Sequence, residues 1–134
     1  MQQATRQHLD RAARNQAVAE ALADAPTSLG LRPPPFDWAV VAAFYAAVHY
    51  VNAYLWERYG VEPRTHAERA RVVATDPNLK QIFVYYDHLS DLGFHARYTR
   101  TFRVSRADVQ HALHTDLERV ARAILTLLGV AKEA

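Results

Sequence analysis

The sequence predicts an all-α protein, an up-and-down bundle of about five helices. Apolar residues recur at helical spacing through most of the chain. Gly and Pro fall almost wholly between these periodic segments, and no segment alternates apolar and polar residues as a strand does. At 134 residues, half of them apolar and 22% charged, the chain is expected to form one folded domain, 1–134.

The first expected helix spans about residues 2–24 and is rich in alanine. A stiff connection to residue 36 follows; its three consecutive prolines favour partly polyproline II structure. Asp37 is expected to cap a long second helix that ends near Tyr59, just before Gly60. The domain therefore divides into an N-terminal helix with its connection, 1–36, and a core, 37–128.

Capping patterns predict the remaining helices. One runs from its cap, Thr65, to about residue 74, and the next from Asp76-Pro77 to a stop at Gly93. Residues 94–104 have no clean period and are expected to form a loop. The final helix begins after Ser105 and ends at Gly129.

The second helix carries no charge from Trp38 to Trp56, yet its His, Asn and Tyr residues make a poor membrane span. Two apolar or aromatic seams run along it. We therefore expect it to be the buried centre of the bundle, with part of it in a dimer interface.

Composition excludes several classes of site. The chain has no Cys, which removes disulfides, thiol nucleophiles and cysteine-ligated metals. The N-terminal residues form no signal peptide, so a cytoplasmic location is expected. No phosphate loop or dinucleotide motif is present, and no histidine–carboxylate pattern typical of metal sites occurs. We therefore expect neither a cofactor nor a metal.

Two stretches resemble the HEPN family of small helical domains. The stretch 38–55 contains a Tyr-Ala-x-x-His pattern and is followed by a Gly turn and Pro-x-Thr-His at 63–66. A second stretch contains Tyr86, Leu89 and Ala-Arg-Tyr at 96–98, ahead of a Ser-capped last helix. The resemblance covers residues 37–128 and implies a helical, often homodimeric domain.

The resemblance also implies two kinds of function. Many HEPN proteins are metal-independent ribonucleases that use an Arg and a His four to six residues apart, two copies meeting across a dimer. Others lack the motif and bind partners, and some are encoded beside small nucleotidyltransferases as toxin–antitoxin pairs. Arg106 and His111 have the required spacing at the start of the last helix. Leu113 stands where a Tyr often follows the His, and residues five apart on an α-helix diverge by about 140°.

Residues 97–106 place arginine at every third position, with Tyr98 and Phe102 between. Basic residues interleaved with aromatic ones suit single-stranded nucleic acid, and the candidate RNA or ligand contacts are Arg97, Tyr98, Arg100 and Arg103. The alternative is that these arginines pair with Asp87, Asp91 or Glu118 and tie the segment to the bundle.

His66 lies in the first turn of the third helix, where it either binds an anion or stabilises the helix start. Tyr45, His49 and Asn52 are candidate buried polar or interface residues of the second helix.

The sequence leaves two functions open for the whole domain. One is a motif-degenerate binding and dimerisation module, with a possible nucleotidyltransferase partner in a toxin–antitoxin or defence system. The other is an endoribonuclease using Arg106 and His111.

Overall fold

The computed structural model describes residues 1–24 and 30–130, and all regular structure in these ranges is helical. The long helices are α1 (Gln3–Ala23), α2 (Phe36–Tyr59), α3 (His66–Thr75) and α4 (Phe83–Tyr98), with a 3-10 turn at Lys80–Ile82 before α4. The last helix consists of α5 (Arg106–His111), a π-helical segment (Ala112–Leu117) and α6 (Glu118–Leu127). Counted this way, five helices form the predicted bundle.

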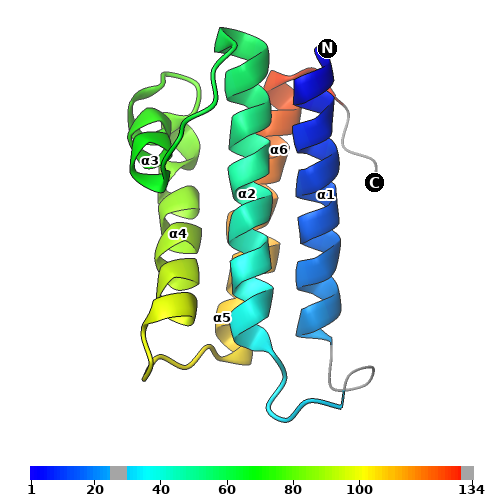
Figure 1. The fold of residues 1–134 in the computed structure, drawn as a ribbon, viewed down its shortest axis with the longest axis vertical. Helices are drawn as coiled ribbons and strands as arrows, with labels where there is room; N and C mark the ends of the chain where they lie inside the picture. Colours follow the sequence, from blue (N-terminus) through cyan, green and yellow to red (C-terminus); the bar gives the residue numbers. More distant parts are fainter. Residues whose placement is uncertain (25–29, 131–134) are drawn as a thin grey trace.

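The second helix is the centre of the bundle. Figure 1 shows α2 between α1 and α4, with α5 and α6 behind it. The short helix α3 lies at the upper end of α4. Fourteen of the 24 residues of α2 are buried, which confirms that it is the buried centre of the bundle. Of its two seams, the one through Val41 and Phe44 is buried, whereas the one through Trp38 and Tyr45 stays partly exposed. The helix is long and apolar enough to cross a membrane, but 83% of its most apolar window is buried, as in the core helix of a soluble domain.

Small side chains let α1 lie close against α2. Ala12 and Ala19 are fully buried, and Ala23 nearly so. Polar contacts add to this packing: Thr5 donates to Glu57 at 2.8 Å, and Tyr50 donates to Gln16 at 3.0 Å. The N-terminal helix is thus an integral wall of the bundle.

The predicted caps of two helices are confirmed. The hydroxyl of Thr65 accepts from the Glu68 amide at 3.0 Å, and Ser105 and Asp108 form a complete capping box. Gly60 ends α2 in the left-handed conformation, with φ of 66°. Asp37 is not the cap of α2: Pro35 occupies that position, and Asp37 lies in the first turn, where its charge favours the helix.

Two boundaries of α4 were predicted wrongly. Asp76 caps only a short turn, accepting from the amides of Asn78 and Leu79, and α4 begins at Phe83. Gly93 does not end the helix, which continues to Tyr98. Its missing side chain instead permits a close approach to α2: a Cβ placed there would lie 3.2 Å from the Cβ of Phe44. The expected loop is thereby shortened to residues 99–104.

The connection between α1 and α2 was expected to be partly polyproline II. Residues 25–29 lie outside the described residues, and the rest bends at Arg32 and Pro33, across a cis peptide bond, before α2 starts.

Candidate functional site

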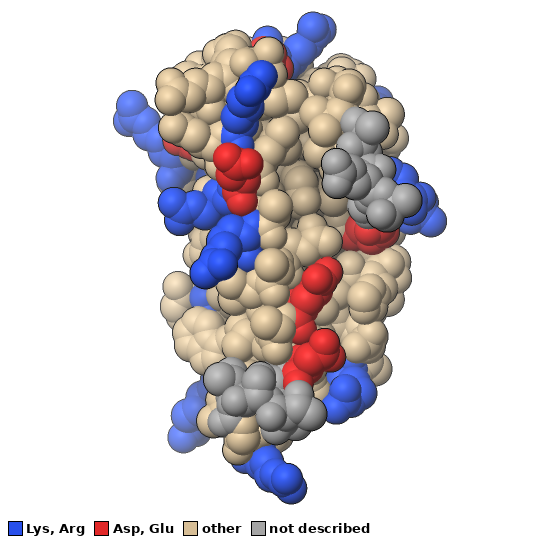
Figure 2. Space-filling model, turned by 90° about the vertical axis from the view of Figure 1, so that its right-hand side faces the viewer, with Lys and Arg blue, Asp and Glu red and all other residues tan. Residues whose placement is uncertain are grey.

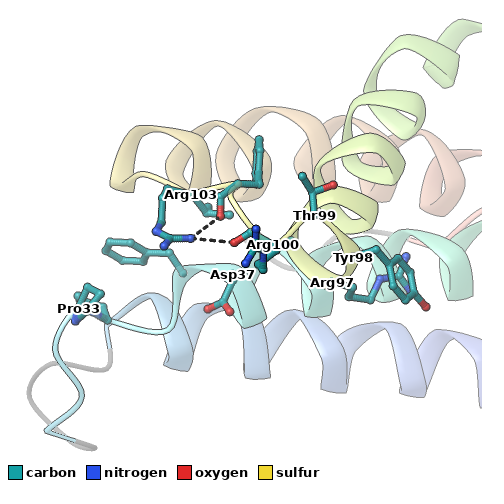
Figure 3. A pocket seen from close by; sticks show the side chains of 12 residues that line it. Pro33, Asp37, Arg97, Tyr98, Thr99, Arg100 and Arg103 are labelled. Atoms are coloured by element: carbon teal, nitrogen blue, oxygen red, sulfur yellow. Dashed lines mark hydrogen bonds between the residues drawn. The ribbon is translucent and has the colours of Figure 1, made fainter.

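A pocket of about 410 Å³ lies at the lower end of the bundle (Figures 1 and 3), between the start of α2, the end of α4 and the 99–104 loop. We call it the arginine pocket. Its lining residues are Pro33, Pro34, Phe36, Asp37, Ala96, Arg97, Tyr98, Thr99, Arg100, Phe102, Arg103 and Val104. The structure thus gathers all four residues of the predicted Arg-Tyr contact set around one hollow.

Local contacts hold the 99–104 loop in place. His95 and Thr99 are joined by a hydrogen bond at 2.8 Å, and the Phe102 amide donates to the Thr99 carbonyl at 3.0 Å. The ring of His95 stacks on Phe102, which is packed against the core together with Val104. The apolar residues of the loop therefore face the bundle, while its arginines stay outside.

Arg97 is both a structural residue and a wall of the pocket. Its Nε donates to the Gly93 carbonyl at 3.0 Å, and its Nη1 donates to the Tyr45 hydroxyl at 2.7 Å. The guanidinium also lies over the rings of Phe44, Tyr45 and Tyr98. These contacts tie the end of α4 to α2 without any carboxylate.

Arg100 and Arg103 are exposed, and Tyr98 beside them is 67% exposed. Arg103 donates to the backbone carbonyls of Arg100 and Phe102 at 3.2 and 3.3 Å (Figure 3). Within the described ranges, no arginine of the pocket forms an ion pair with a carboxylate, including the three acids considered above. Asp37 lies in the same pocket and is its acidic group (Figure 3).

Arg106 and His111 contact different neighbours. The guanidinium of Arg106 lies 5.2 Å from the centre of the Phe36 ring, beside the arginine pocket. His111 donates from Nδ1 to Asp116 at 3.1 Å and packs edge-on against His88. Within one chain, therefore, each member of the predicted pair has its own partners.

The π-helical segment explains the contact between His111 and Asp116. Residues five apart diverge on an α-helix, but the wider π turn, with its i→i+5 bonding, brings them onto the same side. Asp116 is 1% exposed and also accepts from Nδ1 of His88 on α4. The cluster of His88, His111 and Asp116 could not be predicted from the sequence, because His88 and Asp116 are 28 positions apart and no residue pattern predicts a π turn.

The predicted polar residues of α2 each hold a structural contact. Asn52, 4% exposed, accepts from Nε of Arg69 at 3.0 Å, and Tyr45 accepts from Arg97 as described. The Nδ1 atoms of His49 and His8 lie 3.0 Å apart, and Nε2 of His8 lies 2.7 Å from Glu62. Burial lowers the pKa of His49 to about 4, with the nearby cations adding to the effect, so the ring is neutral at physiological pH.

His66 is exposed and does not line the arginine pocket. Its Nδ1 lies 3.1 Å from Nη1 of Arg69, and its ring packs against Phe44 and Tyr45. Burial lowers the pKa of His66, and the positive charges of Arg69 and Arg97 lower it further. A neutral His66 accepts from Arg69, which is compatible with the helix-start role; anion binding at this residue stays a prediction.

The comparison with protein families matches the HEPN domain model over residues 6–128. The chain belongs to the HEPN family. The match begins within α1 and covers all later helices of the domain. Comparison with curated proteins and with solved structures gave no match.

The two family-like stretches of this HEPN domain meet in its core. Tyr45 of the Tyr-Ala-x-x-His pattern bonds Arg97 of the Ala-Arg-Tyr pattern, while Tyr86 and Leu89 are buried against α2. These residues therefore carry the HEPN fold. Among the exposed groups of the domain are those at its lower end and the histidines beside Asp116.

Proposed function

We propose that this HEPN domain is a binding module that holds single-stranded RNA in the arginine pocket. The observation that supports the proposal is that two arginines of this pocket are exposed and have no carboxylate partner among the described residues. These are Arg100 and Arg103. In the part of the chain that the structure describes, the Arg103 guanidinium donates only to backbone carbonyls, and no carboxylate pairs with either side chain. Their charges are available to phosphate, for which the arginine fork is well suited.

The aromatic surface beside these charges supports the same proposal. Tyr98 presents most of its ring to solvent, and Arg97 lies 5.1 Å from the centre of that ring. A base can stack on such a platform while its phosphates pair with the arginines. The face shown in Figure 2 is of mixed charge, with acidic side chains along its middle and basic ones beside them and at its edges.

The proposal is tested by the affinity for a fluorescently labelled single-stranded RNA. We expect the Arg100→Ala/Arg103→Ala variant to bind roughly tenfold more weakly at low salt, and Tyr98→Ala to lose about 1–3 kcal/mol of binding free energy. Arg71→Ala is the matched control, because Arg71 is an exposed arginine on α3, far from the pocket (Figure 1). Equal affinities of all four proteins would refute the proposal.

A second candidate is the metal-independent endoribonuclease implied by the family. The observation in its favour is that the buried Asp116 holds His111 through Nδ1, which leaves Nε2 for proton transfer. Arg106 would stabilise the phosphate charge. The test is RNA cleavage in EDTA: loss of cleavage in both Arg106→Ala and His111→Ala, but not in His114→Ala, supports this candidate. No cleavage by the wild type at high concentration excludes it.

The proposed module is a cytoplasmic homodimer. Support for dimerisation comes from the family and from a shallow groove of about 400 Å³ between α1 and α2, where Val18, Leu22 and Val41 surround a Trp38 that is 58% exposed. A nucleotidyltransferase-type partner, in a toxin–antitoxin or defence system, is part of the proposal on the strength of the family alone.

A further inference from the structure

We infer that His88, His111 and Asp116 form a binding site for a divalent transition-metal ion of the zinc class. Each residue offers one ligand atom, and the three atoms lie within 4.8 Å of one another. Two imidazole nitrogens and one carboxylate oxygen are a common ligand set for Zn²⁺ with a fourth position left to water. The inference does not depend on RNA binding.

One of the three ligand distances already suits such an ion. Tetrahedral zinc with bonds of about 2.0–2.2 Å holds its ligand atoms about 3.3 Å apart. Nδ1 of His111 and the carboxylate oxygen of Asp116 are 3.1 Å apart. Nδ1 of His88 is directed at the same carboxylate oxygen. Two imidazoles from different helices thus hydrogen-bond to a single oxygen. A small rotation of both rings would direct the three ligand atoms at one point between them.

The three side chains differ in exposure in a way that suits a metal site: the carboxylate is buried and the two imidazoles are accessible to solvent. The side chain of Asp116 is 2% exposed, so the carboxylate is fixed by its surroundings and can serve as the rigid anchor. The side chains of His88 and His111 are 47% and 54% exposed. Both rings can therefore rotate by the small amount needed to close on the ion, and solvent can deliver it.

The contacts of Asp116 point to a cation as well. A buried carboxylate is costly unless a positive charge or several donors compensate it. In the described residues, its hydrogen bonds and ion pairs are with these two histidines, and no Lys or Arg pairs with it. A divalent ion would supply that charge: both imidazoles would bind it through Nδ1, giving up the proton that now bonds Asp116 and carrying their proton on Nε2 instead. It would link α4 to the last helix and occupy His111.

The inference is tested by titrating the EDTA-treated full chain with Co²⁺, whose visible absorption is intense only in tetrahedral sites, and by competition with Zn²⁺. We expect one equivalent to bind the wild type, zinc to displace the cobalt, and His88→Ala to bind at least roughly tenfold more weakly. His114→Ala and His8→Ala are controls, because these histidines lie outside the cluster and should bind as the wild type does.

Two results would overturn the inference: no tetrahedral cobalt spectrum at stoichiometric metal, or equal metal affinities of wild type and His88→Ala. Since His88 is exposed, its replacement should leave the fold intact, whereas Asp116→Asn disturbs a buried group. RNA affinity of His88→Ala should equal that of the wild type. Failure of the metal site and failure of the arginine pocket are therefore separate results.

Discussion

The buried side chain of Arg69 links α3 to α2 of this HEPN domain through neutral partners. Arg69 is 6% exposed, and its guanidinium donates to Asn52 and, at 3.2 Å, to the Pro63 carbonyl. Its Nη1 also lies within hydrogen-bond distance of Nδ1 of His66. Because three fixed acceptors match the guanidinium fork, we expect Arg69→Lys to lose about 2 kcal/mol of unfolding free energy. In urea denaturation, the control Arg71→Lys on the exposed face of α3 should change by less than about 0.5 kcal/mol. Equal losses would contradict this role.

His49 makes stability depend on pH. Its folded pKa of about 4 lies below the ordinary 6.5, so in that interval the unfolded chain binds a proton that the folded chain does not. The contribution of His49 is therefore complete above pH 6.5 and is lost as the pH falls to about 4. After discounting for partial exposure, we expect a loss of about 1–2 kcal/mol. His49→Gln should lose less over the same range. Parallel curves for the two proteins would count against the assignment.

At Gly93, the close packing of α4 against α2 explains a glycine that the sequence suggested was a helix end. A glycine at the end of a periodic segment favours a helix stop, but here it lets α4 approach Phe44 of α2. Gly93→Ala gains helix propensity yet forces a Cβ against a buried, backbone-attached atom. We expect a net loss of about 1 kcal/mol in thermal or urea unfolding. Asp91→Ala, on the exposed side of α4, should lose less; a stabilising Gly93→Ala would contradict the packing argument.

The sequence allowed the helix count, the central position of α2 and the caps at Thr65 and Ser105 to be predicted, because periodicity and capping are local. Four residues that line the arginine pocket were predicted as ligand contacts, since they are close together in the sequence, but the part of the pocket formed by residues 33–37 was not. The His88–Asp116 contact was not, because it depends on the register of two packed helices and on a π turn. The register of α4 against the last helix cannot be predicted from the spacing of residues within either helix.

For the whole molecule, the groove around Trp38 is the predicted homodimer contact. An exposed Trp within an apolar groove is typical of an interface anchor. In sedimentation equilibrium, we expect the wild type to dimerise and Trp38→Arg to weaken the dimer at least about tenfold. Val84→Arg is the matched control, because Val84 is an equally apolar, 72% exposed residue on α4. A wild type that stays monomeric, or a dimer weakened equally by both substitutions, would contradict this interface.

In the proposed function, the arginine pocket makes one end of the molecule the binding site for the phosphates of RNA. The most direct test of that claim is the salt dependence of single-stranded RNA affinity. Each phosphate contact contributes about 0.7 to the slope of log K against log salt concentration. We predict that Arg100→Ala/Arg103→Ala reduces the wild-type slope by about 1.4, while Arg71→Ala leaves it unchanged. An unaltered slope in the double variant would contradict the account.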